Sequence, residues 1–167
     1  MLSLSSALAA SASAQGNPAD DPQVVREALT AVNKAWSKVR LDYDSSAADA
    51  MLTPDFFVTL ADRKVGRAEF IRMVSARTPN VRLVRFDNPI LTIVQQPGKD
   101  EWTAVVQEKM EVERTNQDGT KSRVYAMWIT RDGYRRASPG KWMLTSSEEI
   151  MHEGWRNGRK PPFLDWE

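Results

Sequence analysis

The chain has 167 residues, 41% hydrophobic and 27% charged, which is typical of one soluble globular domain. Its 23 basic and 22 acidic residues nearly balance, which argues against a broad basic surface for nucleic acid or anionic membrane. The absence of cysteine excludes disulfides, thiolate metal sites and a cysteine nucleophile.

The N-terminal segment has the composition of an export signal. Residues 2–14 are only Leu, Ser and Ala, and Ala12-Ser13-Ala14 has the small-x-small pattern of a signal-peptidase site. A basic region before the apolar stretch is missing, so we expect a truncated signal peptide over residues 1–14 and a disordered linker over 15–21. The alternative is a disordered leader rich in Ala and Ser. The prediction is a periplasmic or secreted protein without a membrane span, since no later stretch reaches about 18 apolar residues.

Apolar residues at helical spacing begin after Pro22. They recur at intervals of four and three, which predicts a helix over residues 22–43 with one apolar face. The polar residues between them, Asn33 and Arg40 included, are expected to face solvent. A short helix over 47–52, a strand over 56–60, a turn over 61–66 and a third helix over 67–76 follow. The apolar positions of the first helix are Val25, Leu29, Val32, Trp36, Val39 and Tyr43.

From residue 80 the period changes from that of a helix to that of a strand. We expect strands at 81–86, 89–96, 101–115, 121–131 and 141–151, separated by turn sequences such as Asn116-Gln117-Asp118-Gly119. Short loops require antiparallel neighbours. The sequence therefore predicts an α+β domain over residues 22–152, with three N-terminal helices packed on a strongly curved, mostly antiparallel sheet. Residues 153–167 are expected to form a C-terminal tail.

Three local motifs resemble the nuclear-transport-factor-2-like (NTF2-like) superfamily, in particular its SnoaL-like and DUF4440-like bacterial branches. They are AMLTPDFFV at 50–58, VGRAEF at 65–70, and the hairpin MWITRDG at 127–133 with GKW at 140–142. The resemblance covers about residues 22–150. It implies a conical domain built around one apolar pocket, and it specifies the fold far better than the activity.

The same resemblance argues against the familiar chemistry of the superfamily. Compared with ketosteroid isomerases, the oxyanion-hole tyrosine falls on Trp36, the general-base aspartate on Leu60 and the protonated aspartate on Met127. Dehydratases similar to scytalone dehydratase use two histidines, whereas this chain has His152 alone. Neither chemistry is expected in its usual form. No His, Asp and Glu set has metal-ligand spacing, so no metal or other cofactor is expected.

Strand alternation predicts which residues face the pocket. Glu108 lies within the apolar row of strand 101–115, and the match at Met127 places Arg123 and Tyr125 on the same side of the next strand. We therefore expect Glu108 and Arg123 to meet. The pair can order the two strands or anchor the polar end of a ligand. Alternatively, Glu108 can act as an acid–base group with a raised pKa.

The last strand and the aromatic residues complete the predicted pocket. Glu148 and Glu149 are consecutive, so one must face the cavity, and alternation from Trp142 favours Glu148. Both glutamates can instead lie beyond the covered part of the sheet. His152 is expected at the surface or the rim. The predicted ligand-binding residues are Trp36, Tyr43, Phe57, Glu108, Arg123, Tyr125, Met127 and Glu148.

Three functions remain open at this point. The first is an exported domain that binds a small, partly apolar molecule without turnover. The second is an isomerase, cyclase or hydrolase that uses Glu108 or Glu148 for proton transfer. The third is a homodimer formed through the polar outer face of the sheet. The missing acid–base residues favour binding over catalysis, and the dimer is compatible with either.

Overall fold

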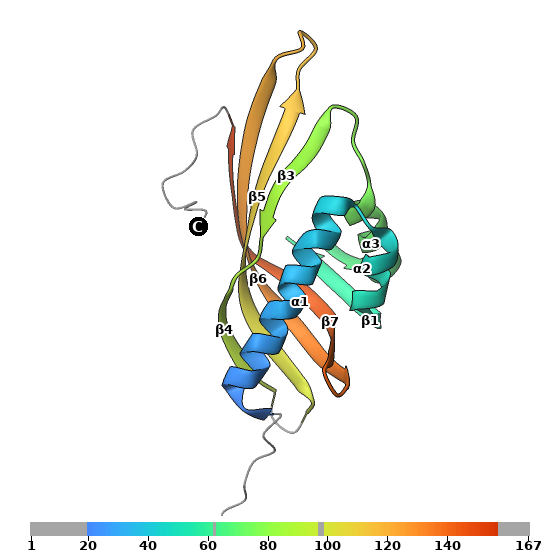
Figure 1. Ribbon diagram of the computed structural model, residues 1–167, viewed down its shortest axis with the longest axis vertical. Helices are drawn as coiled ribbons and strands as arrows, with labels where there is room; N and C mark the ends of the chain where they lie inside the picture. The colour runs from blue at the N-terminus through green and yellow to red at the C-terminus, as the bar shows by residue number, and fades with distance from the viewer. Residues whose placement is uncertain (1–19, 62, 97–98, 157–167) are drawn as a thin grey trace, which may run out of the picture.

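The computed structural model describes residues 20–61, 63–96 and 99–156. The expected signal peptide, most of the linker and the end of the expected tail lie outside the described residues. Figure 1 shows the order of the elements. The helices are α1 (Pro22–Asp42), α2 (Ser45–Met51) and α3 (Arg67–Ser75), and the strands are β1 (Leu52–Leu60), β2 (Arg63–Gly66), β3 (Val81–Asp87), β4 (Ile90–Gln95), β5 (Glu101–Thr115), β6 (Lys121–Ser138) and β7 (Lys141–Arg156).

Local capping explains the bounds of the first two helices. The Asp21 side chain accepts hydrogen bonds from the backbone N–H groups of Gln23 and Val24, and Pro22 follows at the first helical position. Tyr43 ends α1 in the left-handed conformation. The Asp44 side chain then accepts from Ala47 N and caps α2. The predicted helix over 22–43 is confirmed, and α2 begins earlier than expected because Asp44 is its cap.

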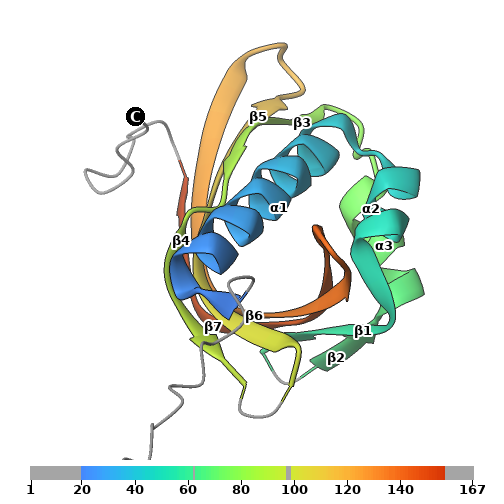
Figure 2. The same cartoon turned by 60° about the horizontal axis from the view of Figure 1, so that its bottom comes forward.

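The strands form one curved sheet in the order β2-β1-β7-β6-β5-β3, with β4 also paired to β5. All neighbours are antiparallel except β1 and β7, which run parallel. Figure 2 shows α1 crossing the open side of the curved sheet, with α2 and α3 beside it. This arrangement confirms the α+β class and a curved, mostly antiparallel sheet.

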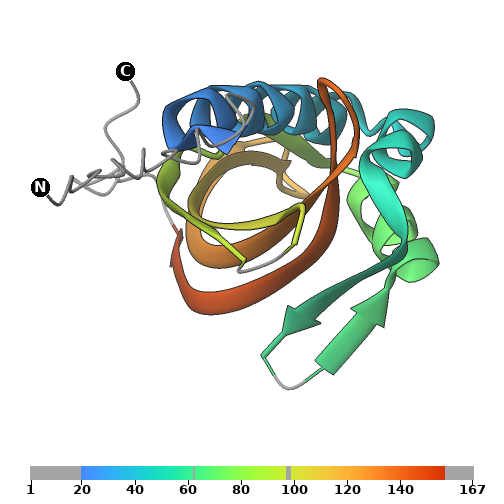
Figure 3. The ribbon, with the colours of Figure 1, turned by 90° about the horizontal axis from the view of Figure 1, so that it is seen from below.

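Two features of the sheet differ from the expectation. The segment expected as a turn contains β2, which pairs with β1 in the hairpin that projects from the rest of the sheet in Figure 3. Ala61 makes this tight connection possible with a positive φ of 52°. Because β1 and β2 precede α3, not all of the helices come before the sheet. The last two strands are also longer than expected, and β7 continues beyond residue 152 to Arg156.

The core lies between α1 and the inner face of β5, β6 and β7, and the predicted apolar face of α1 is buried in it. Asn33 is also buried, contrary to the expectation of a solvent position. The Tyr134 hydroxyl donates to Asn33 Oδ1 at 2.7 Å, and Asn33 Nδ2 donates to the Asn88 carbonyl at 2.9 Å. These bonds satisfy the buried amide. Within the described residues, no helix is both long and apolar enough to cross a membrane.

Candidate functional site

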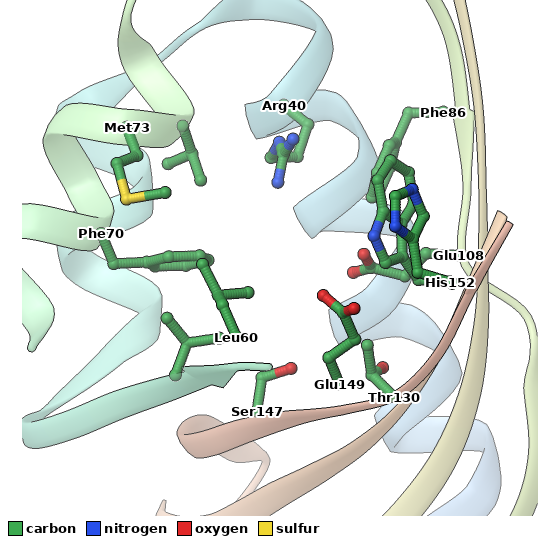
Figure 4. A pocket seen from close by; sticks show the side chains of 13 residues that line it. Arg40, Leu60, Phe70, Met73, Phe86, Glu108, Thr130, Ser147, Glu149 and His152 are labelled. Carbon is green, nitrogen blue, oxygen red and sulfur yellow. The ribbon is translucent and has the colours of Figure 1, made fainter. Parts of the chain in front are cut away.

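A cavity of about 330 Å³ lies between the helices and the inner face of the sheet. Its volume is at the small end of the range for small-molecule sites. Figure 4 shows an apolar wall from β1 and α3 facing a polar wall from α1 and the sheet. The apolar lining residues are Val58, Leu60, Phe70, Met73, Val74 and Phe86. The other lining residues are Arg40, Glu108, Trp128, Thr130, Ser147, Glu149 and His152.

The register of the sheet decides which side chains reach this cavity. The β5–β6 ladder is unbroken, so the inward residue Glu108 faces Trp128, and Ala104 faces Asp132. The β6–β7 ladder contains register shifts, and each one reverses the alternation that follows. These shifts bring Ser147 and Glu149 to the inner face.

Glu108 is the most perturbed carboxyl of the cavity. It lies between the buried Val106 and the partly buried Met110 of β5, deep in the protein but in contact with the cavity space. Burial raises its pKa to about 7, and the charges of Asp132 and Glu149 also raise it, while Arg40 lowers it. A carboxyl with this pKa exchanges a proton readily near neutral pH.

Asp132 is a second buried carboxyl, and it supports the polar wall from behind. It is only 4% exposed and does not line the cavity. Ser147 Oγ donates to Asp132 Oδ1 at 2.6 Å. Burial raises the pKa of Asp132 to about 6, although this hydrogen bond opposes the shift. Asp132 therefore holds the Ser147 hydroxyl in place and adds negative potential near Glu108.

Arg40 brings a positive charge to the cavity from α1. Burial lowers its pKa, and the negative charge of Glu108 opposes that shift. Its guanidinium carbon lies 4.9 Å from the centre of the Phe86 ring, while its buried Nε atom has no hydrogen-bond partner within residues 20–61, 63–96 and 99–156. On the sheet side of the same wall, the Trp128 and His152 rings stack with centroids 4.9 Å apart.

The structure places Glu108 at the cavity, as predicted, but the expected contact with Arg123 is wrong. Arg123 pairs with Glu111 and Glu113 on the outer face of the sheet. Met127 faces Lys109 across the β5–β6 ladder, so it also lies on the outer side. Gln107 Nε2 donates to its sulfur at 3.0 Å.

This error has one physical cause. The predicted alternation on β6 was displaced by one residue, which moves every side chain of the strand to the other face. Tyr125 shares the alternation of Arg123 and Met127, so it too lies on the outer side. The inward residues of β6 are instead Trp128, Thr130, Asp132 and Tyr134.

The prediction for the last strand is also wrong in register. Glu148 lies on the outer face, where it accepts a hydrogen bond from Arg131 at 2.8 Å. Glu149 occupies the inner face in its place. The reason is the register shift that leaves Thr145 as an extra residue and reverses the alternation counted from Trp142.

None of the four predicted aromatic residues lines the cavity. Two of them lie beside it, whereas Phe57, like Tyr125, faces outward. Trp36 is buried and stacks on Phe70, which does line it. Tyr43 accepts a hydrogen bond from Leu83 N and borders an adjoining depression of about 220 Å³. Phe57 lies on the outward side of β1, under the amino group of Lys64.

Sequence reasoning missed Arg40, although a signal was present. Leu29, Asn33, Trp36, Arg40 and Tyr43 also follow helical spacings of four and three, so Asn33 and Arg40 continue the buried face of α1. No comparable signal identifies Ser147 or Glu149, because strand bulges have no sharp sequence pattern. In the described part of the chain, no three His, Asp or Glu side chains are grouped to hold a metal ion.

No family model matches this sequence, and no curated protein matches it. Solved structures do match over most of the chain. A conserved protein from Planctomyces limnophilus is 16% identical, with a TM-score of 0.64, over 80% of this chain and 99% of its own. A type 2 hexachlorocyclohexane dehydrochlorinase (LinA) is 9% identical, with a TM-score of 0.58, over 85% and 97%.

A third solved structure carries the name of the superfamily. It is a putative dehydratase of the NTF2-like family from Streptomyces avermitilis, 16% identical, with a TM-score of 0.54, over 77% of this chain and 97% of its own. These identities are too low to transfer an activity, but the shared architecture covers nearly the whole length of each relative. The chain therefore has the fold of the NTF2-like superfamily.

Proposed function

We propose that this chain is an exported protein whose cavity binds a small, partly apolar molecule. The observation that carries the proposal is the cavity itself, in which an apolar wall faces a wall of polar and charged side chains. Such a site buries the apolar body of a ligand and orients its polar end. The dehydrochlorinase and putative dehydratase of the same fold support a small-molecule role.

A thermal-shift screen with small organic acids, amines, sterols and aromatics tests this proposal. We expect at least one class to raise the melting temperature, because a ligand that binds only the folded state stabilises it. Leu60→Trp, which fills the cavity from β1, should abolish the effect. Thr59→Trp is the matched control, because residue 59 lies on the opposite side of the strand. Failure of every class to stabilise the protein would contradict the proposal.

Proton transfer by Glu108 is the second candidate function, favoured by the pKa of about 7 of a carboxyl that faces the cavity. As a base, it would take a proton from a carbon beside a carbonyl and return it to another carbon. Such an isomerisation needs no co-reactant. Cyclase and hydrolase reactions remain open, and Glu149 replaces Glu148 as the second carboxylate. Glu108→Gln should abolish any turnover found with a stabilising ligand; unchanged turnover would exclude Glu108 as the base.

Export and self-association are separate parts of the proposal. N-terminal sequencing of the full chain after expression with fractionation should find a mature protein that begins near Gln15. Light scattering tests a homodimer through the outer face of the sheet, where Met151 is 39% exposed and pairs with Ile129. A monomer at high protein concentration would contradict the dimer.

A further inference from the structure

Besides His152, three ionisable side chains line the cavity, and none of these three forms an ion pair with the part of the chain that the structure describes. They are Arg40 of α1, Glu108 of β5 and Glu149 of β7. Among the described residues, none of the three has a salt-bridge partner or makes a hydrogen bond. Buried charges without partners are costly, since protein around them replaces water. A ligand that supplies the missing counter-charges would therefore bind with a large electrostatic gain.

The placement of these groups indicates which charges the ligand carries. Figure 4 shows the carboxylates of Glu108 and Glu149 pointing toward one another, and the Arg40 guanidinium entering from the helix side. The charge of Glu149 acts on Glu108, so the two carboxylates are close enough to interact. Two facing carboxylates attract a cation between them, whereas a guanidinium attracts an anion.

Counting charges excludes simpler ligands. The cavity and its immediate surroundings hold the carboxyl groups of Glu108, Glu149 and Asp132 against the guanidinium of Arg40. An anion alone would add negative charge to an acidic site. A cation alone would leave Arg40 without a partner. A ligand that carries both charges satisfies both sides.

We propose that the ligand of this cavity is a small zwitterion with an apolar body, of the amino-acid type. Its ammonium group lies between Glu108 and Glu149, and its carboxylate pairs with Arg40. Its apolar body packs on the wall that includes Leu60 and Phe70. This inference rests on the proposed binding function and names the class of molecule that the same cavity takes.

Four probes with one phenyl body separate the contributions of charge. They are L-phenylalanine, the anion 3-phenylpropanoate, the cation 2-phenylethylamine and the neutral 3-phenylpropan-1-ol, titrated by calorimetry. We expect the zwitterion to bind at least about ten-fold tighter than either single ion, because each charge-assisted contact contributes about that factor or more. The alcohol should bind most weakly.

Two variants test the assignment of each end. Arg40→Gln should weaken the binding of L-phenylalanine and 3-phenylpropanoate by about ten-fold or more. The binding of 2-phenylethylamine should be unchanged or tighter. Glu149→Gln should weaken the binding of L-phenylalanine and 2-phenylethylamine and leave the binding of 3-phenylpropanoate unchanged. A variant that merely folded poorly would weaken both single ions alike. Glu148→Gln and Lys38→Gln are matched controls, since both side chains are exposed and lie outside the cavity.

The outcomes distinguish this inference from the binding function. Equal affinity for the alcohol and the zwitterion, or no effect of Arg40→Gln on the zwitterion, would overturn it. So would a thermal-shift screen, extended to amino acids, in which only compounds without two opposite charges stabilise the protein, and the binding function would then stand. If neither the screen nor the four probes gives any binding, both proposals fail.

Discussion

The two faces of the central sheet differ in whether their charged side chains form ion pairs. On the outer face, Glu148 pairs with Arg131, and both side chains are about half exposed. On the inner face, the next residue, Glu149, lines the cavity without an ion pair among the described residues. Of these consecutive glutamates, one thus has an ordinary surface partner and the other has no ionic partner in the described part of the chain.

This contrast teaches where the function of the domain lies. Exposed ion pairs contribute little to stability and need no further explanation. Charges in a cavity cost stability, and a fold keeps them when something else makes use of them. The inner face also contains a buried polar group that has a partner, the Tyr134 hydroxyl, which donates to Asn33 of α1. Partnered inner groups are therefore structural, and the unpaired ones are candidates for function.

The largest expected effect tests the structural part of the inner face. Asn33→Ala removes the partners of the Tyr134 hydroxyl and the Asn88 carbonyl, and each unsatisfied buried group costs about 1–3 kcal/mol. We expect urea denaturation to show a loss of about 3 kcal/mol. Lys34→Ala, the exposed neighbour on α1, should change stability by less than about 0.5 kcal/mol. Equal small effects would mean that the buried network is not structural.

The second effect tests the cost of the unpaired carboxyl. The ordinary pKa of a Glu is 4.5, and that of Glu108 in the folded protein is about 7. Between pH 4.5 and about 7 the folded state binds more protons than the unfolded state. The free energy of unfolding therefore falls as the pH rises through this range, and it stays lower at higher pH. Glu108→Gln should remove this fall and stabilise the protein at pH 8 by about 3 kcal/mol, since one pKa unit equals about 1.4 kcal/mol.

A matched outer-face variant and a pH series check this prediction. Glu111→Gln removes a carboxylate that is paired with Arg123, so it should be neutral or slightly destabilising at every pH. The Glu108→Gln variant should still lose some stability between pH 3.8, the ordinary pKa of an Asp, and about pH 6, the pKa of Asp132 in the folded protein. This smaller loss remains because Asp132 is still buried. Thermal unfolding from pH 4 to 8 measures both. Destabilisation by Glu108→Gln at pH 8 would show that the ionised carboxylate has a stabilising partner.

The third effect tests the bulge at Thr145, which decides that Glu149 and not Glu148 faces the cavity. A Cβ atom at Gly133 would lie 2.4 Å from Thr145 Oγ1 and 2.7 Å from Ser146 Oγ, so the β7 side chains must move. Gly133→Ala should cost about 1–2 kcal/mol in urea denaturation. Gly154→Ala is the control, because its Cβ would meet nothing closer than 3.8 Å. A neutral Gly133→Ala would mean that the bulge tolerates a side chain there.

The smallest effect tests the outer face. A double-mutant cycle with Arg131→Gln and Glu148→Gln should give a coupling below about 1 kcal/mol, because both side chains are solvent-exposed. A coupling above about 2 kcal/mol would instead indicate that the pair is buried in solution, as in a dimer through this face. The comparison of the two faces would then need revision, because the outer charges would no longer be ordinary surface groups.

Several residues of the site could have been predicted from the sequence. The hairpin that closes at Asn116–Gly119 is continuous, so even-numbered residues of β5 face even-numbered residues of β6. Extending that rule from Glu108 would have selected Trp128 and Thr130 over Met127. Arg40 could have been found from its helical spacing to Trp36, had polar residues been allowed on the buried face of α1.

The sequence by itself determined the order of helices and strands apart from β2, the buried face of α1 and the inward position of Glu108. These features depend on local capping and on periods of 3.6 and 2, which are written in neighbouring residues. Only the tertiary structure decided that Glu149 and not Glu148 faces the cavity, and that Arg40 lies opposite the two carboxylates. The reason is that bulge positions and the crossing of α1 over the sheet depend on contacts between distant segments, where one residue of register reverses a whole strand.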